Sequence, residues 1–189
     1  MLILISEFAG ILTGDDNLTV FADGRLIGYN GGTRDAARWF SFPRETKVIT
    51  VFVYNGPNGF GGFLGVFSNG VVTDSRWKCN ESSIKPDEGW EQTNFTDNTW
   101  PNAIVRQDNS GGQISTRVWG IPDDVHWIST ENHDATRFIC IRRFSKEERL
   151  SKSSKYSVSR FPSSTKYIAH TMVRSGSFNT DRYYYFTIW

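Results

Sequence analysis

Two short, largely apolar runs flank an Asp-Gly pair near the start of the chain. The runs are Thr19–Ala22 and Arg25–Gly28, and the pair between them is Asp23-Gly24. An Asp-Gly pair between such runs favours a type I′ turn, because both central positions of that turn need a positive φ angle. The pattern therefore predicts a β-hairpin.

The strongest strand signal lies at Lys47–Tyr54, where β-branched and aromatic residues follow one another almost without interruption. Such a continuous apolar run predicts a strand that is buried on both faces. Further strand-like runs and one short helical turn follow along the chain. They are Phe60–Phe67, Val71-Val72, Val118-Trp119, Val125–Ser129 and Thr136–Phe144, with the helical turn at Ser145–Leu150.

Many short strands separated by turns predict an all-β sandwich or barrel. The chain contains 17 glycines and lacks long runs of helix-forming residues, which also favours strands joined by turns. A parallel α/β sheet would need amphipathic crossover helices, and the sequence shows none. Aromatic residues make up 15% of the chain, so a packed core is possible at this length.

Two stretches lack strong strand patterns. Residues 80–115 are polar, and a loop of this length is often functional or held in place by other contacts. Residues 151–164 are rich in Ser and Lys, which is typical of a linker. The strand-like pieces beyond it are interpreted as edge strands or as disordered segments; they are Tyr167–Val173 and Tyr183–Trp189. We therefore predict a β-sandwich at residues 1–147 and a basic, Ser-rich linker and C-terminal extension at residues 148–189.

The net charge of +1 excludes a general electrostatic attraction for nucleic acid. The residues after 150 carry several Lys and Arg against a single acid, Asp181, and we interpret them as a solvated basic tail. No apolar run reaches the roughly 20 residues needed to span a bilayer. Residues 1–5 are apolar but lack the basic start of a signal peptide, so we expect them to form a first strand.

A series of motifs runs through residues 5–145. They are the hairpin at Asp15–Gly28, the strand ending at Asn55, the Gly-rich strand at Gly61–Leu64, Thr73–Trp77, Gly89-Trp90, Asp97–Ala103, Trp127-Ile128 and Ile141–Phe144. In their order and spacing they resemble the galactose-binding-like (jelly-roll) β-sandwich modules that accompany rhamnosidases and occur in secreted animal proteins. The resemblance implies an all-β jelly-roll sandwich and a secreted, carbohydrate-binding role.

A pair of acids, Asp15 and Asp16, precedes the first hairpin. With the Leu-x-Val-Phe-x-Asp-Gly pattern that follows, the pair also resembles PA14-type domains, some of which bind calcium through two Asp and bind sugar through the calcium. Two adjacent carboxylates are hard oxygen ligands suited to Ca²⁺. The resemblance implies a calcium site at Asp15 and Asp16; the alternative is that the two residues form a turn or a cap, for which Asp is well suited.

Cys79 and Cys140 are the two cysteines of the chain, and each lies in a strand-like segment beside aromatic residues. Animal members of the galactose-binding-like family carry a pair at similar positions, which implies a disulfide; the alternative is two free buried thiols. Two cysteines without a nearby pair of histidines cannot complete a tetrahedral zinc site. A disulfide favours an oxidising, extracellular compartment.

Three Asn-x-Ser/Thr sequons begin at Asn17, Asn80 and Asn94. Asn80 and Asn94 lie in loop-like sequence, so we predict N-linked glycans there, whereas Asn17 begins a strand and is a weaker candidate. The sequons and the disulfide together predict a secreted or cell-surface protein.

Most of the 7 Trp residues are predicted to fill the core or to hold a loop; these are Trp77, Trp90, Trp100 and Trp127. Trp39 differs, because it follows a polar run and lies near charged residues. A Trp beside charged side chains suits a carbohydrate, which offers apolar ring faces and hydroxyl groups. We predict a ligand site at Trp39, Arg34, Asp35, Arg38 and Asn55, with the alternative that Trp39 simply begins a strand.

No catalytic constellation stands out. The Gly-x-Ser-x-Gly motif of a nucleophilic Ser is absent, and no pair of acids is singled out for glycoside hydrolysis. We therefore predict a non-catalytic module that binds its ligand through loops at one end of the sandwich. Its predicted partner is a glycan or a component of the cell surface or extracellular matrix. One alternative is a structural or adhesive extracellular protein, for which Tyr183–Tyr185 is the cue; another is an accessory domain separated from a larger glycosidase.

Overall fold

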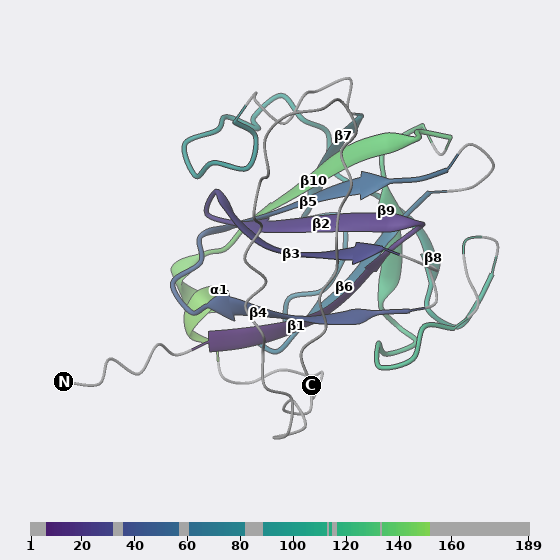
Figure 1. Ribbon diagram of the computed structural model, residues 1–189, viewed down its shortest axis with the longest axis horizontal. Coiled ribbons are helices and arrows are strands. Elements are labelled where there is room, and N and C mark those ends of the chain that lie inside the picture. The colour runs from purple at the N-terminus through teal and green to yellow at the C-terminus, as the bar shows by residue number, and fades with distance from the viewer. Residues whose placement is uncertain are drawn as a thin grey trace, which may run out of the picture. The chain divides into compact units, whose positions relative to one another are not determined.

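Two five-stranded antiparallel sheets pack face to face in the computed structural model, which describes residues 7–31, 36–56, 61–81, 89–112, 114, 117–132 and 134–151. The first sheet has the strand order β4-β1-β6-β9-β8 and the second has the order β3-β2-β5-β10-β7 (Figure 1). The elements are β1 (Glu7–Gly14), β2 (Asn17–Ala22), β3 (Arg25–Gly31), β4 (Arg38–Pro43), β5 (Val48–Tyr54), β6 (Phe63–Phe67), β7 (Lys78–Glu81), β8 (Ile104–Asp108), β9 (His126–Ser129), β10 (Arg137–Arg143) and α1 (Lys146–Leu150). The predicted fold class, an all-β sandwich, is confirmed.

The hairpin predicted around Asp23-Gly24 joins β2 to β3. Both turn residues have positive φ angles, 48° at Asp23 and 84° at Gly24, as a type I′ turn requires. The carboxylate of Asp23 also accepts hydrogen bonds from the backbone N–H groups of Lys47 and Val48. This Asp therefore stabilises the turn and also connects it to the start of β5.

β5 is buried on both faces, as its continuous apolar run predicts. Val51 and Val53 point into the core between the sheets. On the opposite face, Phe52 packs against an outer cluster that includes Trp90. That cluster is covered by the segment 89–100, which comes from the long polar stretch after β7.

The segment 89–100 is held against the second sheet by Arg143, at the end of β10. The guanidinium of Arg143 donates to the carboxylate of Asp97 at 2.8 Å and to the backbone oxygens of Thr93 and Phe95. The ammonium of Lys78 donates to the backbone oxygen of Asp97 at 2.9 Å. A polar segment thus becomes an ordered cover because charged side chains of the strands bind its backbone.

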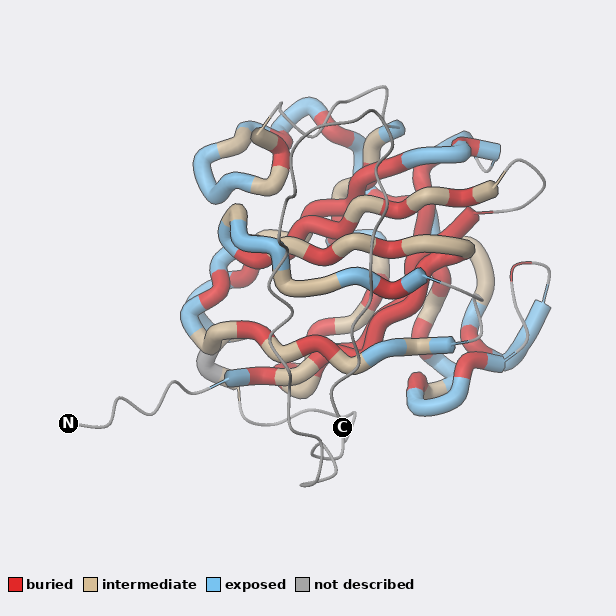
Figure 2. Tube along the Cα trace, in the orientation of Figure 1, coloured by how far each residue is buried: buried red, intermediate tan, exposed pale blue. Residues whose placement is uncertain are grey.

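Aromatic rings fill much of the space between the two sheets. Along the chain, the strands are mainly buried and the peripheral loops are mainly exposed (Figure 2). Trp77 is fully buried there. Its indole stacks on Phe67, with ring centroids 6.1 Å apart, and meets the edge of Phe63 at 5.0 Å. The indole N–H donates to the backbone oxygen of Val72 at 2.9 Å, so the polar atom of this large side chain is paired.

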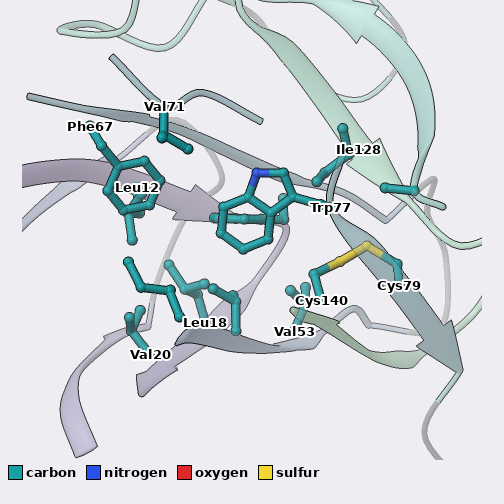
Figure 3. Packing of buried hydrophobic residues seen from close by; sticks show 14 of the residues in the cluster. Leu12, Leu18, Val20, Val53, Phe67, Val71, Trp77, Cys79, Ile128 and Cys140 are labelled. Atoms are coloured by element: carbon teal, nitrogen blue, oxygen red, sulfur yellow. A yellow bond between two sulfur atoms is a disulfide. The ribbon is translucent and has the colours of Figure 1, made fainter. Parts of the chain in front are cut away.

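Cys79 of β7 and Cys140 of β10 lie directly opposite each other and form a disulfide, which confirms the predicted pairing. Both residues are fully buried in the same core cluster as Trp77 (Figure 3). β7 has only four residues and lies at the edge of its sheet. The disulfide therefore ties a short edge strand to an interior strand.

The predicted helical turn is α1, and Ser145 caps it. The Ser145 hydroxyl accepts from the backbone N–H of Glu148 at 3.2 Å, and the Glu148 carboxylate accepts from the backbone N–H of Ser145 at 2.9 Å. This reciprocal capping box stabilises a helix too short to form alone. The same carboxylate forms ion pairs with Arg142 and Arg76.

Several strand predictions differ from the structure. β6 begins at Phe63 rather than Phe60, and Val72 forms only an isolated bridge with Val66. The strand predicted at Val118-Trp119 is wrong, because the backbone N–H and C=O of Val118 bond to the side chain of Asn109 instead of to a neighbouring strand. The sequence patterns also failed to predict β1 and β8, and they gave β4 only as the alternative in which Trp39 begins a strand.

Some predictions lie outside the described residues. These are the first strand at residues 1–5, Arg34 and Asp35 of the ligand set, and nearly all of the extension with its strand-like pieces. The boundary at residue 147 therefore stays a prediction. In the part of the chain that the structure describes, no helix is both long and apolar enough to cross a membrane.

Candidate functional site

Three of the predicted site residues, Asp15, Asp16 and Asn55, lie at one end of the sandwich. The strand register pairs Gly14 with Phe63 and Asn17 with Tyr54, which brings the ends of β1, β2, β5 and β6 together. The end that the sequence predicted as a binding surface is therefore assembled from segments far apart in the chain.

The side chains and backbone groups of these residues hold this end together. Asp15 is buried, and its backbone N–H donates to the oxygen of Gly62 at 2.9 Å. Asp16 adopts a left-handed conformation with φ of 61°, which Asp tolerates better than most residues. Its carboxylate accepts from the backbone N–H of Gly56 at 2.5 Å. Asn55 is also buried. The two aspartates therefore act as turn residues here.

The calcium prediction is not supported by a larger acidic cluster. Calcium takes six to eight oxygen ligands, usually from several carboxylates and carbonyls. Among the described residues, no group of three or more His, Cys, Asp or Glu side chains lies close enough to hold a metal ion. One carboxylate of the pair, that of Asp16, already accepts a hydrogen bond from a backbone N–H. Calcium binding at Asp15 and Asp16 stays a prediction.

Arg38 and Trp39 are consecutive on β4, so their side chains point to opposite faces of the first sheet. The guanidinium of Arg38 donates to the backbone oxygen of Tyr29 at 3.0 Å, which connects the edge strands β4 and β3 of the two sheets. Trp39 is half-buried and packs against an outer cluster beside its cross-strand partner Ile11. Trp39 therefore lies within a strand, as the alternative interpretation expected.

The four tryptophans predicted to be structural are all buried: Trp77, Trp90, Trp100 and Trp127. Trp77 fills the central core, and Trp127 lies in the outer cluster of the first sheet. Trp90 and Trp100 belong to the segment 89–100 and pack against the outer face of the second sheet. Their predicted role in filling the core or holding loops is confirmed.

A different tryptophan is exposed, and the sequence patterns missed it. Trp119 is 78% exposed, the largest value of any large hydrophobic side chain among the described residues. It lies in the segment between β8 and β9, which covers the outer face of the first sheet with the buried side chains of Val118 and Ile121. The available signal was the Gly120-Ile121-Pro122 sequence, because a Gly and a Pro within three residues after the Trp indicate a turn rather than a strand.

Two charged side chains flank Trp119. The guanidinium carbon of Arg117 lies 5.2 Å from the centre of the indole ring, a cation–π distance. The Nε of Arg117 lies 2.7 Å from Oδ1 of Asp123, in an ion pair whose side chains are both about half exposed. We call Arg117, Trp119 and Asp123 together the Trp119 platform. It presents an apolar ring beside hydrogen-bond donors and acceptors.

The backbone under the platform is fixed by Asn109, which is fully buried. Its side-chain amide donates to the backbone oxygens of Val118 and Ile121, at 2.9 and 2.7 Å, and its oxygen accepts from the N–H of Val118 at 2.8 Å. The backbone N–H of Asn109 also donates to the oxygen of Asp123. One buried amide thus holds both ends of the turn that exposes Trp119, so the backbone that carries the indole is ordered before any ligand binds.

The platform and Trp39 share the outer face of the first sheet. A Cβ atom added at Gly120 would lie 3.6 Å from the side chain of Ile11, and Ile11 is the cross-strand partner of Trp39.

Asp108 is the last residue of β8, at the start of the segment that carries Trp119. The hydroxyl and backbone N–H of Ser110 donate to Asp108 and lower the pKa of that carboxyl below its ordinary value. The segment that carries Trp119 therefore starts from an ionised acid at neutral pH.

The three sequons differ in their surroundings. The side-chain oxygen of Asn17 accepts a hydrogen bond from the hydroxyl of Tyr29 at 2.6 Å, so this amide is part of the β2–β3 pairing. Asn80 is half-buried on β7, whereas Asn94 is exposed in the segment 89–100. Asn94 is therefore the most accessible of the three in the folded protein.

We expect an N-linked glycan at Asn94 when the chain is made in a eukaryotic secretory pathway, because its side chain points into solvent. Digestion with a peptide N-glycosidase should remove one glycan mass that the Thr96→Ala variant lacks. Asn17→Gln serves as the matched control and should leave the mass of the glycosylated protein unchanged. Loss of the glycan in Asn17→Gln alone would contradict the prediction.

Comparisons with known proteins identify no relative of this chain. The chain matches no protein-family model, no curated protein and no solved structure. The resemblance to galactose-binding-like modules therefore rests on the sequence motifs alone, and function has to be argued from the residues described above.

Proposed function

We propose that this protein is a non-catalytic, extracellular glycan-binding module that binds its ligand on the Trp119 platform. The observation that carries the proposal is an indole 78% exposed to solvent next to the ion pair of Arg117 and Asp123. Exposure of so large an apolar side chain leaves a favourable burial free energy unused in the isolated chain. A ligand that covers the ring would gain it.

A sugar ring matches the chemistry of the platform. One face of a hexose carries mainly C–H groups, which pack on an aromatic ring, and its edges carry hydroxyl groups that both donate and accept hydrogen bonds. Arg117 supplies donors and Asp123 supplies acceptors at the edge of the indole. Because Asn109 fixes the backbone of the turn, little conformational entropy is lost when the ligand binds.

The extracellular part of the proposal is supported by the buried Cys79–Cys140 disulfide, since disulfides persist in oxidising compartments. The predicted glycan at Asn94 is compatible with a binding site on the Trp119 platform. Asn94 lies in the segment that covers the second sheet, whereas the Trp119 platform lies over the first sheet. A glycan at Asn94 would therefore leave the platform accessible.

The test is binding of the full chain to a glycan array, followed by the Trp119→Ala variant on the glycans that bind. We expect the substitution to weaken binding at least about thirtyfold, corresponding to the roughly 2 kcal/mol typical of a central aromatic contact. The thermal unfolding midpoint should hardly change, because the lost side chain is exposed. The array is run with calcium and with a chelator, which tests the Asp15–Asp16 prediction at the same time.

Leu26→Ala is the matched control, because Leu26 is an exposed apolar residue on β3 of the other sheet. It should bind glycans as the unsubstituted protein does. Folded protein that binds no glycan in either arm of the array would refute the proposal and would favour the alternative role in protein contacts. Equal loss of binding in both variants would show that the site does not lie on the platform.

A further inference from the structure

We propose that the Trp119 platform selects neutral sugars and rejects acidic ones, because Asp123 already balances the charge of the guanidinium that an acidic sugar would need. This inference rests on the proposed glycan-binding function and goes further, since it names the chemical class of the ligand. It is carried by the geometry of the Arg117–Asp123 pair and by the distribution of charge around it.

Arg117 is the one base of the Trp119 platform. An isolated Arg beside an exposed aromatic ring is well suited to bind a carboxylate or a sulfate, because its planar fork matches two oxygens at once. Here the Nε edge of Arg117 lies 2.7 Å from Asp123, and its guanidinium also lies over the indole of Trp119. An acidic ligand would therefore meet a guanidinium whose Nε edge is already paired and whose charge is already balanced by a carboxylate of the protein.

Acidic residues outnumber basic ones in the segment that carries the platform. The segment from the end of β8 to the start of β9 contains Asp108, Asp123 and Asp124 but only one base, Arg117. The pKa of Asp108 is lowered by the hydrogen bonds from Ser110, so this acid is ionised at neutral pH. The segment therefore carries a net negative charge, which repels anions within about a Debye length of ~8 Å at physiological salt.

The Arg117–Asp123 pair can also form hydrogen bonds with a neutral ligand. The Asp123 side chain is 53% exposed and can accept hydrogen bonds from sugar hydroxyls. The ionised carboxylate of an acidic sugar has no proton to donate to Asp123. Arg117 is 49% exposed and can donate to hydroxyl and ring oxygens. Adjacent hydroxyls on one sugar ring can meet such a donor–acceptor pair while the ring face covers Trp119.

The experiment uses an array of matched glycans, in which each neutral oligosaccharide is paired with its sialylated, sulfated and uronic-acid forms. The full chain should bind the neutral member of each pair and leave the acidic members near background. Asp123→Asn should raise the affinity for acidic members by about fivefold at low salt, the size of one exposed ion pair, because it releases Arg117.

Asp124→Asn is the matched control, because it removes the same charge from the next residue without opening the Arg117–Asp123 pair. It should change the affinity for acidic members by less than about twofold, because the Arg117–Asp123 pair stays closed and only one of the three acids that repel anions is lost. Neutral selectivity, together with relaxation in Asp123→Asn but not in Asp124→Asn, supports the inference.

The failing outcomes distinguish this inference from the function on which it rests. Acidic members that bind as well as or better than their neutral partners would overturn the inference while glycan binding stands. Neutral selectivity that Asp123→Asn leaves unchanged, or that both variants relax equally, would overturn the role given to the ion pair. Binding to no member of any pair would overturn the proposed function and the inference together.

Discussion

Replacing Trp77 with Ala is expected to lower the free energy of unfolding by about 3–5 kcal/mol, the range for a large aromatic residue removed from a packed core. Trp77 is fully buried between the sheets and contacts Phe67 and Phe63. The substitution removes these contacts and leaves the backbone oxygen of Val72 without its indole donor. A domain of this kind has a total stability of about 5–15 kcal/mol, so the substitution removes a large share of it.

Urea unfolding followed by Trp fluorescence and by circular dichroism measures this effect. Trp119→Ala is a sharp control, because it makes the same chemical change at a side chain that is 78% exposed. Its free energy of unfolding should stay within about 0.5 kcal/mol of the unsubstituted protein. A Trp77→Ala variant as stable as Trp119→Ala would show that the core between the sheets is not packed around Trp77. If Trp77→Ala does not fold at all, Trp77→Phe should still fold with a smaller loss.

The parts of the fold that the sequence predicts are those determined by local patterns. The hairpin at Asp23-Gly24 follows from the conformational freedom of two adjacent residues, and β5 follows from a run of β-branched and aromatic residues. The capping box of α1 is likewise set within four residues of Ser145. In each case the physical cause lies within the segment, so a single sequence is enough to identify it.

The parts that the sequence did not predict depend on contacts between distant residues. β8 lies in a polar stretch, and its pairing depends on β9 rather than on its own composition. The order of the segment 89–100 depends on Arg143, more than forty positions away in sequence. Val118 is apolar and strand-like, but Asn109 takes its backbone hydrogen bonds and turns the chain there. Propensity alone cannot predict which distant side chain supplies such a partner.

The candidate site shows the same division. The sequence located Asp15, Asp16 and Asn55 near one end of the sandwich, because turn residues at strand ends are a local signal. It did not distinguish Trp39, half-buried on β4, from Trp119, exposed on a turn. That difference depends on which face of the first sheet is covered and by what, and the cover comes from the β8–β9 segment. Exposure of an aromatic residue is therefore a tertiary property.

Removing the disulfide is the second change with a large expected effect. Cys79 and Cys140 are 61 positions apart in sequence, and closing a loop of that length stabilises a fold by about 4 kcal/mol in the chain-entropy model. The double variant Cys79→Ala/Cys140→Ala should lose about that amount, together with a smaller contribution from the missing sulfur atoms in the core. Its unfolded chain is also less compact, so the dependence of the free energy of unfolding on urea concentration should become steeper.

Val51→Ala separates the entropic effect from simple loss of packing, because Val51 is buried directly opposite Cys140 on β5. This control removes apolar volume from the same layer while the disulfide stays closed. It should lower the unfolding midpoint without changing the urea slope, whereas the double Cys variant should change both. An unchanged slope in the double variant would mean that the disulfide acts mainly on the folded state, by holding the short edge strand β7 against β10. In that case hydrogen exchange in the double variant should be accelerated in β7 but not in β5, which is buried on both faces.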